Sequence, residues 1–155
     1  MEDIWPIVVM HNISSSSRCT EFVRIASGLG YKTMVISQAQ GSAAQKGVPA
    51  AQKLAFKERA NFLVLYSLQD VVDLFSPEEV ILVAPPPYGK EKLDKNLAEQ
   101  IKGRKYAIVF GGSDPGLSRK DLDMGRSVQL PVGDIGSIGT LSIGLAILKG
   151  LITTD

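Results

Sequence analysis

The 155-residue sequence is poor in the side chains that cross-link a fold or hold a transition metal. It contains one cysteine, Cys19, and one histidine, His11. A single cysteine cannot form an internal disulfide, and one cysteine with one histidine cannot supply a cysteine–histidine metal centre. We therefore expect no metal, a buried Cys19, and a His11 that is hydrogen-bonded at the end of a strand.

The sequence also has no charge of one sign in excess and no long apolar run. Seventeen Lys and Arg residues oppose sixteen Asp and Glu residues, so no bulk field marks a polyanion-binding protein, although a balanced total can hide a basic face. No segment supplies the roughly 18 consecutive apolar residues of a membrane helix, and the apolar run after the acidic N-terminus is too short for a signal peptide. We expect a cytoplasmic protein without membrane contact. The hydrophobic content of 45% predicts one domain over residues 1–155.

The common nucleotide-binding motifs are missing as well. No Gly-Lys-Ser/Thr triplet occurs, and a Walker phosphate loop requires one. The first apolar run is followed by "HNISSSS", where a dinucleotide-binding fold would carry its glycine-rich turn. These absences disfavour nucleoside triphosphate and dinucleotide cofactors.

What is present is an alternation of β-branched apolar runs with stretches of helical periodicity. Continuous apolar runs predict strands that are buried on both faces, and therefore a mostly parallel sheet flanked by helices in the α/β class. The expected strands are 6–10, 31–37, 61–66, 79–84, 106–110 and 127–132. The expected helices are 16–29, 50–60, 68–75, 91–101 and 138–150.

Two segments between these elements have the composition of loops. The small and polar residues 39–50 predict a loop that leads into the next helix. Three consecutive prolines follow the fourth strand, and proline permits neither helix nor ladder pairing there. Residues Pro85 to Gly89 are therefore expected to form a stiff, exposed loop.

Glycine is concentrated after residue 110. The stretch "FGGSDPGLS" ends a predicted strand, and "LPVGDIGSIGTLSIGLAIL" runs from a strand through a glycine-rich turn into a helix. Small residues let a backbone approach another backbone or a ligand closely. Because ligands bind at the carboxyl ends of strands in open α/β sheets, these turns are the first candidates for a site.

Residues 106–148 resemble the C-terminal signature of the SPOUT superfamily, the knotted RNA methyltransferases that include the SpoU/TrmH class. Gly112-Ser113-Asp114 stands where the class has Gly-x-Glu, Gly116-Leu117-Ser118 matches outright, Leu130-Pro131 resembles Ile-Pro, and Thr140-Leu141-Ser142 replaces Ser-Leu-Asn. Arg24 and Gly30 have the spacing of the family's first motif. The chain looks like a minimal, divergent member of archaeal type.

The resemblance implies a deep trefoil knot formed by the C-terminal segment, a homodimer, and S-adenosylmethionine as cofactor. Three loops would meet around the cofactor, and the double glycine would admit it. The positions that match these loops are Ala84, Pro85, Phe110, Gly111, Gly112, Leu130, Val132, Ile135, Thr140 and Leu141.

The resemblance also implies catalytic and RNA-binding residues. Arg24 would orient a ribose hydroxyl and its phosphate, since a guanidinium stays protonated. Asp114 would act as a base or pair with an arginine of the partner subunit, although a plain turn aspartate before a proline fits equally. Ser142 is the third catalytic candidate and could equally be a hydroxyl of the helix cap region. Arg18, Asn12 and Arg119 are the residues expected to contact RNA.

The function implied is S-adenosylmethionine-dependent methylation of an RNA, tRNA or rRNA, at a ribose 2′-hydroxyl. Two alternatives stay open. One is a base methyltransferase that relies on Asp114. The other is a catalytically silent knotted homodimer that binds RNA or a protein.

Overall fold

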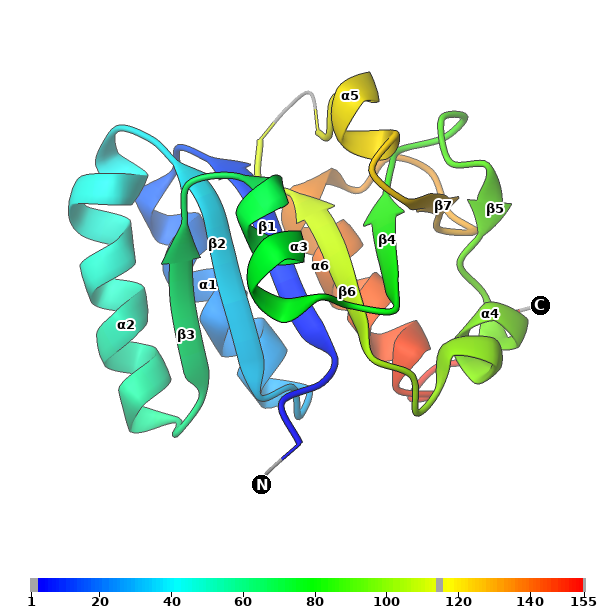
Figure 1. Cartoon of the computed structure of the whole chain (residues 1–155), viewed down its shortest axis with the longest axis horizontal. Helices are drawn as coiled ribbons and strands as arrows, with labels where there is room; N and C mark the ends of the chain where they lie inside the picture. Colours follow the sequence, from blue (N-terminus) through cyan, green and yellow to red (C-terminus); the bar gives the residue numbers. More distant parts are fainter. Residues whose placement is uncertain (1–2, 114–115, 155) are drawn as a thin grey trace.

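The computed structural model describes residues 3–113 and 116–154, and its centre is a seven-stranded, all-parallel sheet (Figure 1). The strand order is β3-β2-β1-β6-β4-β7-β5, so β1 and β6 are neighbours at the centre. The strands are β1 (Ile7–Ile13), β2 (Thr33–Ala39), β3 (Asn61–Leu65), β4 (Glu79–Val83), β5 (Glu91–Lys92), β6 (Tyr106–Gly111) and β7 (Arg126–Gln129).

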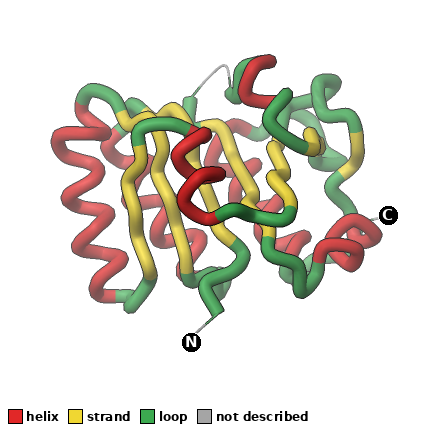
Figure 2. Tube along the Cα trace, viewed as in Figure 1, coloured by secondary structure: helices red, strands yellow, loops and turns green. Residues whose placement is uncertain are grey.

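Helices cover both faces of the sheet (Figure 2). One apolar cluster joins the sheet to α1, α2, α4 and α6, and a second cluster joins its other face to α3. The helices are α1 (Ser16–Gly28), the π-helical turn η1 (Ala43–Gly47), α2 (Val48–Lys57), α3 (Leu68–Phe75), α4 (Lys95–Ile101), α5 (Arg119–Leu122) and α6 (Gly136–Leu148).

The two faces of β1 show why the apolar runs of the sequence are continuous. Val8 and Met10 belong to one core cluster, whereas Ile7 and Val9 belong to the other. Successive side chains of a strand point to opposite faces, so a strand covered on both sides needs an apolar residue at every position. The prediction of an α/β fold with a parallel sheet between helices is confirmed. The knot stays a prediction, because strand order alone does not show threading.

All six predicted strands are present, but some boundaries were wrong. The segment 39–50 is not a simple loop, because η1 and the start of α2 lie within it. The expected strand 127–132 ends at Gln129, and the expected helix 91–101 begins only at Lys95. Asp94 caps that helix by accepting a hydrogen bond from the Leu97 N–H (2.9 Å), and β5 precedes it.

Two other local predictions are confirmed. Pro85, Pro86 and Pro87 form an exposed loop after β4, and Cys19 is buried.

No helix among residues 3–113 and 116–154 is long and apolar enough to cross a membrane.

A network of charged side chains ties together the beginnings of the outer strands. Arg126 of β7 binds both carboxylate oxygens of Glu91, at 2.5 and 2.8 Å, and also Glu79 of β4 at 3.2 Å. Arg104 contacts the other oxygen of Glu79 at 3.1 Å. The hydrogen bond from Arg126 lowers the pKa of Glu91 below its ordinary value. Arg126 therefore pairs with carboxylates of neighbouring strands.

Candidate functional site

A cavity of about 340 Å³ opens at the carboxyl edge of the sheet, between the loops that follow β4, β6 and β7. This edge lies at the arrowheads of the strands in Figure 1. The size is in the usual range for small-molecule sites. Its lining residues are Val83, Ala84, Pro85, Pro86, Gly111, Ser113, Gly116, Leu130, Val132, Gly133, Asp134, Gly136, Ser137 and Thr140.

The double glycine after β6 serves backbone packing as well as the cavity. A Cβ on Gly111 would stand 2.8 Å from the Gly116 Cα, and a Cβ on Gly112 would stand 3.0 Å from the Asn12 carbonyl oxygen. Of these two glycines, Gly111 lines the cavity and Gly112 does not. The missing side chain of Gly112 lets two loops touch, and the admission of a ligand by the pair stays a prediction.

Hydrogen bonds fasten the loop after β6 to the N-terminal part of the chain. Arg18 of α1 donates to the Gly112 carbonyl at 2.8 Å, and the Ser113 hydroxyl donates to the Asn12 carbonyl at 2.6 Å. Asn12 has a left-handed backbone (φ 63°), and its side-chain oxygen accepts from Gln40 at 3.4 Å. Arg18 and Asn12, expected to contact RNA, are thus engaged in positioning this loop.

The start of α6 presents the most unusual polar atom of the cavity. The hydroxyl oxygen of Ser137 is buried and has no hydrogen-bond partner among the described residues. An unpaired buried hydroxyl costs free energy, so a cavity that contains one is suited to a polar ligand. Just before it, Gly136 has a left-handed backbone (φ 77°), and its N–H donates to the Asp134 carboxylate at 3.0 Å. Sequence reasoning missed Ser137.

A second, larger cavity of about 620 Å³ adjoins the first and shares Pro85 and Gly116 with it. It carries cationic side chains, which the first cavity lacks. Lys90, Arg119, Asp123 and Ser127 line it, together with the apolar or small residues Pro85, Pro87, Tyr88, Gly116, Leu117 and Leu122. Arg119, one of the residues expected to contact RNA, therefore lines this cavity.

The structure brings six of the ten expected cofactor positions to the first cavity: Ala84, Pro85, Gly111, Leu130, Val132 and Thr140. The other four, Phe110, Gly112, Ile135 and Leu141, do not line it. Phe110 and Leu141 are fully buried core residues, and a Cβ on Gly144 would meet the Phe110 ring at 2.9 Å. Their apolar character thus reflects the packing of α6 on β6.

Two of the residues predicted to be catalytic, Arg24 and Ser142, lie away from the cavity. Arg24 is exposed on α1, and Ser142 donates its hydroxyl to the Ile138 carbonyl of the same helix at 2.9 Å. Neither residue lines either cavity. Asp114 lies outside the described residues. The catalytic roles expected of Arg24, Asp114 and Ser142 stay predictions.

His11 lies at the same edge but is closed off from solvent. Its Nδ1 is 2.8 Å from the Ser37 hydroxyl, and its Nε2 is 3.6 Å from the Asp121 carboxylate. Burial lowers the pKa of His11 and outweighs the opposing effect of Asp121. His11 is thus a hydrogen-bonded residue near the end of β1, as expected, and it links β2 and α5.

A metal centre requires a cluster of donor side chains. Within 3–113 and 116–154, no group of three or more His, Cys, Asp and Glu side chains could hold a metal ion. Two-metal hydrolytic sites rest on such groups. The described residues thus do not fit a metal centre.

Comparison with known proteins assigns the chain by sequence. Residues 41–147 match a family model described as "RecB-family nuclease (DUF2122)". The chain belongs to the DUF2122 family. The chain is 33% identical, over 89% of its length and 92% of the relative's, to "Putative type II restriction enzyme MjaORF1200P" of Methanocaldococcus jannaschii. It is 34% identical, over 94% of its length and 92% of the relative's, to an Aeropyrum pernix protein named in the same way, ApeKORF2002P.

Solved structures show the fold of this DUF2122 chain in other proteins. The structure named "Probable Methyltransferase from Bordetella pertussis Tohama I" superimposes with a TM-score of 0.72 at 15% identity, covering 93% of this chain and 92% of that one. The SpoU methyltransferase AviRb from Streptomyces viridochromogenes, in complex with AdoMet, gives 0.74 at 14% identity, covering 97% and 62%. At such low identity the likeness shows a SPOUT-like fold and nothing about the reaction.

The functional prediction from the sequence needs correction. The chain was expected to be an RNA methyltransferase, and the family model together with two relatives over most of its length overturns this, because they carry the names of nucleases and restriction enzymes. The predictions that the chain is a transferase and that it modifies RNA are wrong for the same reason. The coarser prediction of an enzyme agrees with these names, and the SPOUT resemblance holds for the fold.

Proposed function

We propose that this DUF2122 chain is a nuclease that cleaves phosphodiester bonds of a nucleic acid. The observation that carries the proposal is the sequence relationship, which extends over nearly the whole chain and over 92% of two relatives named as restriction enzymes. The carboxyl edge of the sheet is the place we assign to this activity, since two adjoining cavities open there.

The larger cavity has the chemistry that a phosphodiester requires. Lys90 and Arg119 would attract the phosphate, and an arginine can bind its oxygens through two donors. Asp123 lines the same cavity and is our candidate for the base that takes a proton from the attacking water. No step is assigned to a metal, because the described donor set does not fit one.

The experiment is cleavage of supercoiled plasmid DNA and of a long RNA by the purified chain, each with Mg²⁺ and with EDTA. We expect nicked or linear product from one of the two polymers. Asp123→Asn and Arg119→Gln should each lower the rate about a hundredfold or more, as loss of a base or of charge stabilisation does. Lys53→Gln on α2 is the matched control and should change nothing. Intact substrates under all conditions would contradict the proposal.

We also propose that the smaller cavity binds the adenosyl part of S-adenosylmethionine. Three observations support this: the cavity size, the bare backbone around Gly111 and Gly133, and the unpaired hydroxyl of Ser137. Bound there, the ligand would supply an adenine edge and ribose hydroxyls as hydrogen-bond partners. The backbone of the loops and the Ser137 hydroxyl would bind these groups.

This second proposal is tested by calorimetric titration with S-adenosylhomocysteine and with adenosine. Ser137→Ala should weaken binding about five- to tenfold, which corresponds to one hydrogen bond of about 1 kcal/mol. Ser142→Ala is the control, because that hydroxyl is already bonded within α6. Absence of heat with both ligands, in protein shown to be folded, would reject adenosyl binding.

A homodimer and an RNA substrate remain proposals as well. Val132 and Ile135 leave 40% and 44% of their surface exposed just before α6, and a second copy of the chain could cover them. Light scattering after gel filtration gives the oligomeric state, and replacing Ile135 by Glu should dissociate a dimer built on this patch. The cleavage assay with both polymers decides between RNA and DNA.

A further inference from the structure

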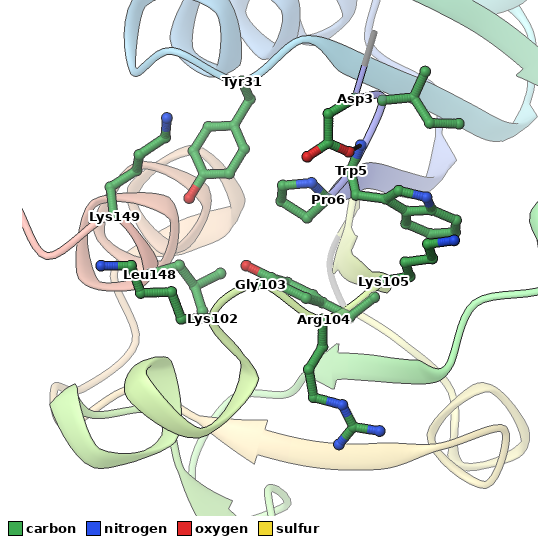
Figure 3. Close-up of a pocket in the computed structure, with 12 residues that line it drawn as sticks. Asp3, Trp5, Pro6, Tyr31, Lys102, Gly103, Arg104, Lys105, Leu148 and Lys149 are labelled. Atoms are coloured by element: carbon green, nitrogen blue, oxygen red, sulfur yellow. Dashed lines mark hydrogen bonds between the residues drawn. The ribbon is translucent and has the colours of Figure 1, made fainter. Parts of the chain in front are cut away.

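A cavity of about 650 Å³ lies at the opposite, amino edge of the sheet (Figure 3). Four separate segments build it: residues 3–6 before β1, Tyr31 before β2, residues 102–106 at the start of β6, and residues 148–149 at the end of α6. It shares no lining residue with the two cavities at the carboxyl edge. It is therefore a separate candidate site.

The walls of this amino-edge cavity are strongly basic. Lys102, Arg104, Lys105 and Lys149 line it, against the single carboxylate of Asp3. Arg104 is paired with Glu79, whereas none of the three lysines lies within ion-pair distance of a carboxylate among the described residues. The nearby carboxylates have other partners. Asp3 accepts the backbone N–H of Trp5 at 3.0 Å, and Glu78 accepts the backbone N–H of Lys105 at 2.9 Å.

Aromatic rings complete the cavity. Trp5, Tyr31 and Tyr106 line it, and the Lys149 ammonium stands 5.0 Å from the centre of the Tyr31 ring. The Tyr31 hydroxyl donates to the Leu145 carbonyl at 2.7 Å, which fixes this ring against α6. In Figure 3, Trp5 and Pro6 stand on one side and Lys149 and Lys102 on the other. Flat apolar surfaces thus face cationic groups across one hollow.

The basic surface continues into an adjoining cavity of about 250 Å³, which shares Lys102, Leu148 and Lys149 with the first. This second hollow adds Lys95 and Glu99. Together the two hollows are lined by five cationic side chains and two carboxylates, an excess of three positive charges on a chain whose formal net charge is only +1. Positive charge is therefore concentrated around these two adjoining hollows, which share Lys102 and Lys149.

A purely structural role accounts for only part of this cluster. Lys149 caps the carboxyl end of α6 and donates to the Gly30 carbonyl at 3.2 Å, and a cation is favourable at that end of a helix. Lys102 and Lys105 have no such bond from their side chains among the described residues, and both are exposed. Gathering like charges without a counter-ion is unfavourable, so these lysines point to an anionic ligand.

We propose that the amino-edge cavity binds the phosphate groups of a nucleotide, either free or at the end of a nucleic-acid strand, with its base against Trp5 and Pro6. Lysines bind phosphate as point charges, and base stacking on an aromatic ring tolerates any base. The choice of a nucleotide as the anionic ligand rests on the proposed nuclease function. The preference for an anion rests on the charge of the cavity alone.

Trp5 provides the readout, because it is the single tryptophan of the chain and lines the cavity. The intact chain is titrated with ATP, with inorganic phosphate, and with a ten-nucleotide thymidine strand, while tryptophan fluorescence is recorded. We expect a saturable change with ATP, with the strand, or with both, and the pattern distinguishes a free nucleotide from a strand end. Binding should weaken steeply with added salt, as phosphate contacts do.

The variant pair K102Q/K105Q removes two charges without touching the bonds of Lys149, and we expect affinity to fall about tenfold or more. The pair K53Q/K57Q on α2 removes the same charge from another exposed surface and should leave affinity unchanged. No fluorescence change with any probe, or equal losses in both pairs, would overturn the proposal. Saturable binding by a chain that cleaves neither DNA nor RNA would leave this site standing and reject the nuclease.

Discussion

The smaller cavity at the carboxyl edge of the sheet and the cavity at the amino edge are formed by opposite means. At the carboxyl edge, the cavity after β4, β6 and β7 is lined by small residues and backbone, and its distinctive atom is the unpaired Ser137 hydroxyl. At the amino edge, the cavity is lined by long lysines and aromatic rings. The smaller carboxyl-edge cavity therefore depends on the absence of side chains, and the amino-edge cavity depends on charged ones. Substitution of the tightly packed glycines at the carboxyl edge should lower stability, whereas charge substitutions at the amino edge should change binding without harming the fold.

The largest effect is expected from Gly89→Ala in the loop at the carboxyl edge. A Cβ there would stand 2.4 Å from the Val128 carbonyl carbon, so the loop and β7 must separate. We expect the free energy of unfolding to fall by about 3 kcal/mol, the upper range for overpacking. Denaturant unfolding measures it. Gly133→Ala is the control, since nothing lies within 4 Å of its Cβ, and equal stability of both variants would refute the comparison.

A smaller loss is expected at the amino edge for Tyr31→Phe. The hydroxyl of this buried residue donates to the Leu145 carbonyl at 2.7 Å, and its removal leaves that oxygen without this donor. The cost should be about 1 kcal/mol in the free energy of unfolding. Tyr66→Phe, at an exposed ring, is the control and should cost nothing measurable. A loss as large as that of Gly89→Ala would show that the amino edge depends on packing to the same degree.

Arg126→Met tests whether the charged network at the amino ends of the outer strands adds to stability. Its side chain and that of Glu91 are partly exposed, so solvent screens the pair, and we expect a loss of about 1 kcal/mol or less. The loss should shrink when salt is raised. A loss that is independent of salt would assign it to packing of the arginine stem instead.

The smallest effect is a pH dependence that originates at His11. Because burial lowers the pKa of His11, the folded chain binds this proton less readily than the unfolded chain, whose value is near 6.5. Stability should therefore decrease as the pH falls through that value, and the slope should flatten in His11→Gln. Thermal unfolding between about pH 7.5 and about pH 5.5 measures the slope, above the range where carboxylates titrate. An unchanged slope would mean that His11 is not the responsible group.

The sequence predicted the sheet well because burial on both faces forces continuous apolar runs, as in β1. It missed β5, which has only the two exposed residues Glu91 and Lys92, and α5, which has four residues. Such short elements carry no periodicity. Their positions depend on partners elsewhere in the chain, such as Val128 and Gln129 for β5.

The candidate sites were predicted unevenly for a related reason. Glycines and prolines record backbone geometry, so their pattern located the loops of the carboxyl-edge cavity and the SPOUT-like fold. The reaction depends on side chains, which this pattern does not record, and methyl transfer, inferred from the SPOUT resemblance, was the wrong reaction. The amino-edge cavity was invisible in the sequence, because Trp5, Tyr31 and its lysines come from segments that meet only in the folded chain.

Strand β6 joins the two edges, since Tyr106 at its start lines one cavity and Gly111 at its end lines the other. Five residue steps of a strand measure about 17 Å. β6 is also central, paired with β1 and β4 on either side. The strand therefore fixes the distance between the two openings. A polymer that occupies both openings at once has to bend around the flank of the domain. The length of that path sets the shortest polymer that could occupy both.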